Sequence, residues 1–277
     1  MANSINAIQT PVARSLQSSQ EQQNKAIQRL STMLRINSAR DDAAGIAIFD
    51  RLSADIIGSN QGIRNANDGI SYMQTAEGGL GQMTDNLQRM RELAVQASNS
   101  TLSASDRSAI QAEVNQLSQS NAQITDSTSF AGQKVFQGGG QTLSFQVGPD
   151  AGAGNQIQAE VQSMDGLNSV QGGSNGIDVS NVSSAQDAIS RIDADLEAIA
   201  QQRASFGAVQ NRLGAAISNA EEYSINSQAA RSGIGDADVA KEMSRLIQGQ
   251  ILSQASTASY AQANQSRKMV LNLLGGG

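Results

Sequence analysis

The stretch between Asp41 and Ser98 constrains the fold more than any other part of the chain. From residue 63 onward its apolar side chains recur in alternating steps of three and four, the pattern of one face of a long coiled-coil helix. No proline interrupts the stretch, and each of its glycines costs only about 1 kcal/mol relative to alanine. A helix of about 55 residues extends for about 80 Å, so it needs packing partners along its whole length. The apolar positions are Ile63, Ala66, Ile70, Met73, Leu80, Met83, Leu87, Met90, Ala94 and Ala97, with either Ala76 or Glu77 between Met73 and Leu80.

The composition suits long helices and removes most catalytic chemistry. Aromatic residues make up only 3% of the chain, which leaves few large side chains for a globular core. The chain has no histidine and no cysteine, so it lacks the residues of Ser-His-Asp and Cys-His catalysis, the usual zinc ligands and any disulfide. We therefore predict that the protein is not an enzyme and has no catalytic residues, bound metal or cofactor.

Two groups of aspartates are candidates for cation binding or acid/base chemistry. They are Asp41 with Asp42 and Asp236 with Asp238. No further set of ligands is evident near either group, and a carboxylate at a helix start is stabilised by the free backbone N–H groups and by the helix dipole. Capping of helix N-termini is therefore the favoured interpretation, with Asn37 or Ser38 as the cap ahead of the first pair.

Charge and hydropathy limit the partners. The formal net charge is −6, which disfavours nucleic acid and anionic membranes because both are bound mainly through Lys and Arg. No run approaches the length of apolar sequence that a membrane-spanning helix needs. The first residues, MANSINAIQT, contain neither a basic n-region nor an apolar h-region. If the protein is exported, we expect it to leave without a cleaved signal peptide.

The two ends of the chain carry amphipathic but sparse apolar faces. Burying so few side chains does not offset the entropy of ordering each segment, so we predict that the N-terminal segment is disordered in the free monomer. The economical arrangement pairs the two ends with each other and with neighbouring copies. Pro11 suggests a break or a first helical turn in the N-terminal segment. The predicted contact residues are Ile5, Ile8, Val12, Leu16, Ile27, Leu30 and Leu34 at one end and Val239, Met243, Leu246, Ile247, Ile251, Ala255, Leu271 and Leu274 at the other.

The middle of the chain adds two more helices and a short β-region. A second helix is predicted over residues 105–126, with Asn121 filling one position of its apolar seam, and a short connection makes it antiparallel to the first. Apolar residues then alternate with period two near residues 143–147 and 157–161, which predicts a β-hairpin. Residues 148–182 otherwise read as a loop at the far end of the rod. Helical spacing returns at Ser184 and is broken by Gly233 and Gly235.

The predicted fold is mainly α: long antiparallel coiled-coil helices forming a rod, with a small β-hairpin region at mid-chain. The predicted division places an N-terminal inner helix at 1–40, the N-terminal rod helices with the hairpin and loop at 41–182, a C-terminal rod helix at 183–235 and a C-terminal inner helix at 236–277.

Several motifs of this sequence together closely resemble bacterial flagellin. The resemblance covers residues 1–147 and 183–274, so the chain is identified as a short member of that family without its large variable outer domains. One departure is Gly235, where the family usually has Glu. The motifs are RLSTMLRINSARDDAAGIA (29–47), NANDGIS (65–71), LQRMRELAVQA (87–97), FAGQKV (130–135), FGAVQNRL (206–213), IGDADVA (234–240) and QILSQASTASYAQANQSRKMVLNLL (250–274).

The resemblance implies a structural subunit that polymerises, by coupled folding of its terminal helices, into the extracellular bacterial flagellar filament used for motility. The terminal contact residues would then form the inner core of the filament. The implied partners are copies of the chain, the type III flagellar export apparatus, an export chaperone, and cap and junction proteins. The alternative within the family is a hook-filament junction protein.

The resemblance also implies a surface that an innate immune receptor recognises. The alternative is that the same residues are ordinary solvated side chains making axial contacts between subunits. The residues are Gln88, Arg89, Arg91, Glu92, Leu93 and Glu113.

Overall fold

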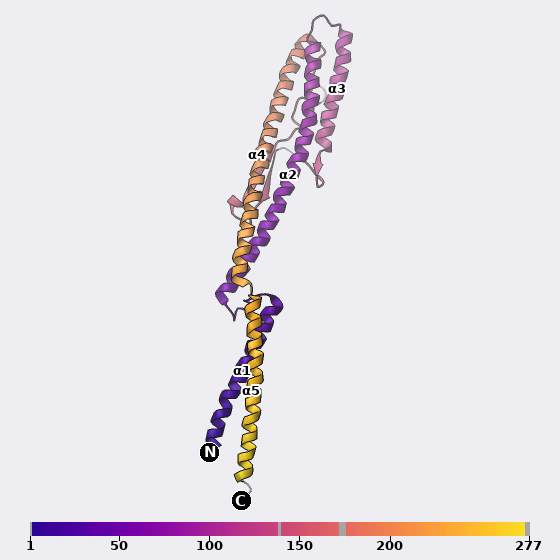
Figure 1. Cartoon of the computed structure of the whole chain (residues 1–277). Helices are drawn as coiled ribbons and strands as arrows, with labels where there is room; N and C mark the ends of the chain where they lie inside the picture. Colours follow the sequence, from indigo (N-terminus) through magenta and orange to yellow (C-terminus); the bar gives the residue numbers. More distant parts are fainter. Residues whose placement is uncertain (1, 138–139, 172–175, 275–277) are drawn as a thin grey trace. The chain divides into compact units, whose positions relative to one another are not determined.

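A computed structural model describes residues 2–137, 140–171 and 176–274 (Figure 1). Side chains are described in these ranges except at residues 2–12, 267 and 270–274. The described chain is dominated by long α-helices, with two small antiparallel sheets. The predicted mainly α fold with a small β-hairpin region is therefore confirmed. None of the described helices is both long enough and apolar enough to cross a membrane.

The chain divides into two compact units. The terminal unit contains Met1–Ala54 and Asn226–Gly277, and the central unit contains Asp55–Ile225. Helices α2 (Ala43–Ala97) and α4 (Val182–Gly235) contribute residues to both units. The four-part division expected from the sequence stays a prediction.

Three helices build the central unit: α2, α4 and α3 (Ala104–Ser127), and both α3 and α4 run antiparallel to α2 (Figure 1). The start of α3 is fixed by a capping box, in which the Ser103 side chain accepts from the Asp106 N–H and the Asp106 side chain accepts from the Ser103 N–H. The helix predicted at 105–126 is confirmed. Helix α4 continues through Gly233 to Gly235, so the expected break at Gly233 is wrong.

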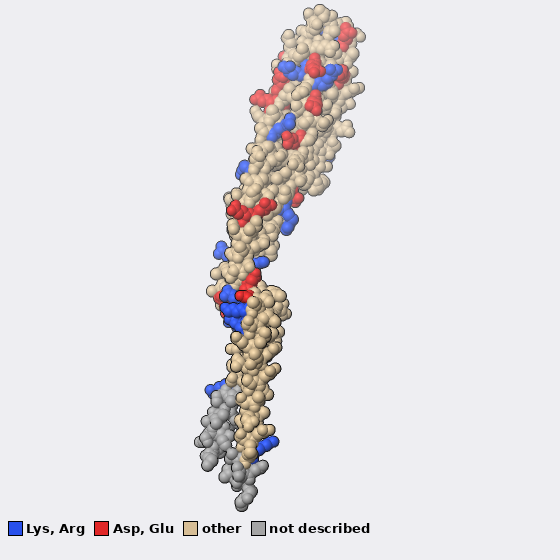
Figure 2. All heavy atoms as spheres, viewed as in Figure 1, with Lys and Arg blue, Asp and Glu red and all other residues tan. Residues whose placement is uncertain are grey.

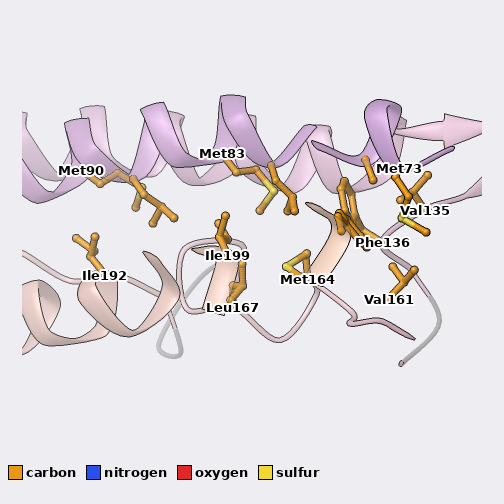
Figure 3. Close-up of a cluster of buried hydrophobic side chains, with 14 of the residues drawn as sticks. Met73, Met83, Met90, Val135, Phe136, Val161, Met164, Leu167, Ile192 and Ile199 are labelled. Atoms are coloured by element: carbon orange, nitrogen blue, oxygen red, sulfur yellow. The ribbon is translucent and has the colours of Figure 1, made fainter. Parts of the chain in front are cut away.

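The seam predicted on α2 forms the core of the central unit. From Met73 to Met90 its large side chains are fully buried, and Ala76 rather than Glu77 completes the seam between Met73 and Leu80. In Figure 3, Met83 and Met90 of α2 face Ile192 and Ile199 of α4 across this core. Asn121 of α3 is also fully buried, and its Oδ1 accepts a hydrogen bond of 2.8 Å from Asn86 Nδ2 of α2. A paired buried amide of this kind fixes the register between two helices.

Two hairpins follow α3. Strands β1 (Ser129–Phe130) and β2 (Gln133–Lys134) form a minimal pair, and β3 (Gln141–Gln146) pairs with β4 (Gln156–Val161) in the register Phe145↔Ile157. A short 3-10 helix, η1 (Ala153–Asn155), lies between β3 and β4. The alternating apolar residues of β4 are buried, as the period of two predicted.

Glycines of α2 explain how the β3–β4 hairpin reaches the helices. A Cβ atom on Gly62 would lie 2.5 Å from the carbonyl oxygen of Val147, and one on Gly58 would lie 2.8 Å from Cβ of Pro149. Asn65 Nδ2 donates a 3.0 Å hydrogen bond to the Gln146 carbonyl nearby. The end of the hairpin therefore packs directly on the backbone of α2, which only a residue without a side chain permits.

The segment between β4 and α4 was expected to be a loop at the far end of the rod. Its described residues form neither helix nor strand, so the loop is confirmed, but its place at the far end is wrong. Met164 and Leu167 (Figure 3), together with Ile177 and Val179, are buried in the core, and Val170 is partly buried against it. The segment is also fixed by polar side chains of the helices. Buried Asp195 of α4 accepts hydrogen bonds from the Ser169 N–H at 2.7 Å and from Asn168 Nδ2 at 2.9 Å, and Gln111 of α3 accepts from the Val179 N–H at 2.6 Å.

Candidate assembly surface

The terminal unit is built on an antiparallel pair of helices, α1 (Ala2–Thr32) and α5 (Val239–Leu274) (Figure 1). Helix α1 continues through Pro11, so the break suggested there is wrong. The Leu34–Asp236 β-bridge joins the segment after α1 to the segment before α5. Arg35 N donates to the Gly235 carbonyl at 2.7 Å beside this bridge. The two helices are thereby held together at one end.

Aspartates cap the N-termini of α2 and α5, which begin shortly after the two segments that the Leu34–Asp236 bridge joins. Asp42 Oδ1 accepts from the Gly45 N–H at 2.8 Å at the start of α2, and Asp238 Oδ1 accepts from the Lys241 N–H at 3.1 Å at the start of α5. Capping is therefore the role the structure gives to both residues. The predicted cap ahead of Asp41 is wrong, because the residues at 37 and 38 do not cap a helix.

Asp41 instead closes the turn before α2. Its carboxylate accepts hydrogen bonds from the Asn37 N–H and from the N–H and hydroxyl of Ser38. The bond from the Asn37 amide, with smaller contributions from Ser38, holds the pKa of Asp41 below its ordinary value. Among the described residues no group of three or more acidic side chains is placed to hold a metal ion.

The Phe49 ring of α2 packs against the end of α4. A Cβ atom on Gly235 would lie 2.3 Å from the Phe49 ring, and the Arg231 guanidinium lies 5.7 Å from the ring centroid. Gly235 departs from the Glu that the family resemblance led us to expect, and the structure supplies the physical reason: the Phe49 ring occupies the space of any side chain at 235.

The most deeply buried residues between α1 and α5 are small or polar. Ser19 and Ala26 of α1 are buried, and so are Glu242 and Gly249 of α5. Each pair is seven residues apart, which is the repeat of a coiled coil. A Cβ atom on Gly249 would lie 2.8 Å from Gln23 Cγ, so the two helices approach closely here. The sequence predicted that the two ends pair and named Leu16, Leu30 and Leu246, which are partly buried, but it did not identify the small and polar residues of the seam.

Glu242 is the polar centre of the seam. Its side chain is 6% exposed, and its Oε1 accepts from Arg245 at 2.6 Å on the same helix and from Arg29 at 3.4 Å on α1. A buried carboxylate with cationic partners on both helices fixes their register more than it adds stability.

Most of the predicted contact residues whose side chains are described lie outside this seam. On α5, Met243, Ile247 and Ile251 are 43%, 50% and 61% exposed. Together with Val239 and Ala255, which are also exposed, they are spaced four residues apart and form a surface that we call the outer stripe. Ile27 is likewise exposed, whereas Leu16, Leu30, Leu34 and Leu246 are partly buried. The side chains of Ile5, Ile8, Val12, Leu271 and Leu274 lie outside the described residues.

Beyond Arg245 the surface around the outer stripe carries no charged residue until Arg267 in the sequence. Figure 2 shows a largely uncharged surface along the described part of α5. A row of residues at steps of four is the ridge that packs into the groove of another helix. Exposed apolar ridges without charge are typical of protein contacts.

The second predicted surface lies on the central unit. Arg89 of α2 donates to Glu113 of α3 at 2.8 Å and to Glu92 at 3.0 Å; the bond to Glu113 is the largest cause that raises the pKa of Arg89. Arg91 donates to Asp193 of α4 at 2.7 Å. Gln88 is exposed, but Leu93 is buried in the core and therefore does not belong to any surface.

Comparison with known proteins identifies two matching family regions. The model of the bacterial flagellin N-terminal helical region matches residues 4–141, and the model of the bacterial flagellin C-terminal helical region matches residues 189–274. The chain is 44% identical over 253 residues to a flagellin of Halalkalibacterium halodurans, covering 91% of this chain and 92% of that protein. It is 37% identical over 276 residues to Flagellin FlaB1 of Treponema pallidum, covering 94% and 95%.

A solved structure agrees with these matches. The crystal structure of Bacillus cereus flagellin superposes with a TM-score of 0.50 at 26% identity, and the match covers 57% of this chain and 88% of that one.

Proposed function

The chain belongs to the bacterial flagellin family and is a structural subunit of the flagellar filament, and on this premise we propose that the outer stripe and its surroundings form the contacts between subunits. The filament is extracellular, so the protein acts outside the cell. Nothing in the matches favours the hook-filament junction alternative. In this proposal residues 1–40 and 236–277 form the inner core of the filament.

The uncovered outer stripe is the observation that carries the proposal. Full burial of a large apolar side chain contributes about 1.5 to 3 kcal/mol. Since Met243, Ile247 and Ile251 are about half exposed, covering these three side chains adds about 2 to 5 kcal/mol per subunit. A neighbouring copy that covers the stripe supplies this contribution, and each added subunit repeats it.

The composition of the α1–α5 seam supports coupled folding. Ser19, Ala26 and Gly249 bury little apolar surface when the two helices pair, and an isolated helix is only marginally stable in water. We therefore expect the terminal helices of a free subunit to be weakly ordered. They become stable when neighbouring copies cover the outer stripe, so that association and ordering occur together.

Weakly ordered ends also suit export of an extended chain. We infer that the chain leaves the cell through the type III flagellar export apparatus, with a chaperone before export and with cap and junction proteins at the filament. The absence of cysteine means that no disulfide opposes threading. We further propose that an innate immune receptor binds the central unit. The residues that support this proposal are the exposed Gln88, Arg89, Arg91 and Glu92 and the partly exposed Glu113.

Substitution at Ile251 tests the contact surface. Ile251→Asp places a charge in the outer stripe, whereas Ile251→Leu keeps the stripe apolar at the same position. We expect seeded polymerisation, followed by sedimentation and electron microscopy, to fail for the aspartate variant and to proceed for the leucine variant. Circular dichroism of the unassembled chains controls for folding of the central unit. Filaments from Ile251→Asp at the wild-type concentration would contradict the proposal. A chain lacking residues 1–35 should also fail to polymerise while its central unit keeps its helicity.

A further inference from the structure

The methionines of the chain are divided between the two units by exposure. In the central unit, Met73, Met83, Met90 and Met164 are at most 1% exposed. In the terminal unit, the methionines with described side chains are Met33, Met243 and Met269, and they are 57%, 43% and 60% exposed. Thioether sulfur is oxidised according to its access to the oxidant, so these two groups differ in susceptibility.

Oxidation changes the character of the side chain without breaking the chain. With a two-electron oxidant such as hydrogen peroxide, the O–O bond breaks, one oxygen bonds to the sulfur and the other leaves as water with the two protons of the peroxide. The sulfur loses two electrons and becomes a sulfoxide. The product is polar, and methionine sulfoxide reductase reverses the change.

Of the three exposed methionines, Met243 alone belongs to the outer stripe. It lies one helical turn from Val239 and one turn from Ile247, both exposed apolar residues of the same stripe. Met33 instead lies in the link after α1, where its backbone has a φ of 57°. An oxygen added at Met243 therefore places a strong dipole within the apolar ridge, which burial against another helix would leave without a partner.

We propose that Met243 is an oxidation site that controls assembly: its sulfoxide blocks addition of a free subunit to a filament. The proposal rests on the proposed function of the outer stripe. Once a neighbouring copy covers the stripe, the Met243 sulfur is protected, so oxidation acts on subunits that have not yet assembled. The buried methionines keep the central unit intact while this happens.

Peroxide treatment of the free subunit tests the proposal. Peptide mass spectrometry should find sulfoxide at Met33, Met243 and Met269 and little at the four core methionines. The lowest concentration that supports seeded growth should rise about tenfold, equivalent to about 1.4 kcal/mol. Treatment with methionine sulfoxide reductase should restore growth. In intact filaments Met243 should be oxidised at least about tenfold more slowly than in free subunits.

Two variants assign the effect to one sulfur. Met243→Leu keeps the stripe apolar and should polymerise equally well before and after peroxide. Met33→Leu combined with Met269→Leu keeps Met243 and should lose growth after peroxide as the wild type does.

The proposal is wrong if Met243→Leu is as sensitive to peroxide as the wild type, if Met243 escapes oxidation in the free subunit, or if subunits carrying its sulfoxide grow normally. Failure of the untreated wild-type chain to polymerise would instead contradict the proposed function itself.

Discussion

Two glycines of the same helix should respond to alanine with opposite signs. Both Gly62 and Gly78 lie inside α2, where replacing glycine by alanine favours the helix by about 1 kcal/mol. A Cβ atom on Gly78 meets nothing within 4 Å, so Gly78→Ala should stabilise the central unit by about that amount.

Gly62→Ala meets the backbone of the hairpin instead. Its Cβ would lie 2.5 Å from the Val147 carbonyl oxygen and 2.6 Å from the Val147 carbonyl carbon, and neither atom can rotate away as a side chain would. Overpacking of this kind costs about 3 kcal/mol at the upper end of the usual range, which leaves a net loss of about 2 kcal/mol after the helical gain.

Thermal unfolding followed by circular dichroism measures the difference. For a unit of this size 1 kcal/mol corresponds to a Tm change of about 2 to 4 °C. We expect the Tm to fall by about 4 to 8 °C for Gly62→Ala and to rise by about 2 to 4 °C for Gly78→Ala. Changes of the same sign and size in both variants would refute the docking of the hairpin on α2.

Three further outcomes follow from the contacts described above. Asp195→Ala leaves three N–H donors of the segment before α4, one buried and two partly buried, without their acceptor and should lower the free energy of unfolding by about 3 to 5 kcal/mol, whereas Asp193→Ala on the same helix removes an exposed ion pair and should cost less than about 1 kcal/mol in urea titrations. Gly235→Glu should destabilise the terminal unit by displacing the Phe49 ring, and Phe49→Ala in the same chain should restore the stability measured by urea unfolding. Because the pKa of Asp41 is lowered in the folded state, Asp41 stabilises the folded state fully at a pH above 3.8, the ordinary pKa of its carboxyl group, and this stabilisation is lost as the pH falls through the lower folded pKa. Hydrogen exchange of the amides of this turn should therefore show protection that disappears with acid, and Asp41→Asn should lack the protection at all pH values.

The sequence predicted the central unit well where burial depends on large apolar residues. Met83 and Leu87 stand at alternating steps of three and four, and no other face of α2 offers an equally continuous row, so the seam had one solution. The burial of the segment before α4 was not predicted, for the opposite reason. Met164 and Ile177 are isolated in a run of Gly, Ser and Asn without a period, and the segment is held by hydrogen bonds that Asp195 accepts and Gln111 donates, from positions distant in the sequence.

At the candidate assembly surface the sequence identified apolar residues but not their partners. Periodicity marks Ile247 and Ile251 as one face of a helix, and it does not say whether that face packs within the chain or against another copy. The structure distinguishes packing within the chain from packing against another copy. The internal seam uses Ala26 and Gly249, which are too small to stand out in the apolar pattern of the sequence. Contact between chains is therefore inferred here from what the internal packing leaves uncovered.

The two faces of α5 differ in composition: one packs on α1 mainly through small and polar residues, and the other carries the exposed apolar outer stripe. This difference favours a terminal unit whose stability depends on assembly. An internal seam built on large apolar residues would make the α1–α5 pair stable in the free subunit and leave less to gain from a neighbour. The observed seam fixes register through Glu242 and close approach through Gly249, while Met243, Ile247 and Ile251 remain exposed. Register is thus specified within the chain, and in the proposed assembly the exposed apolar residues of the outer stripe add stabilisation through contact between chains. We therefore expect a subunit with this arrangement to become fully ordered only where neighbouring copies are present.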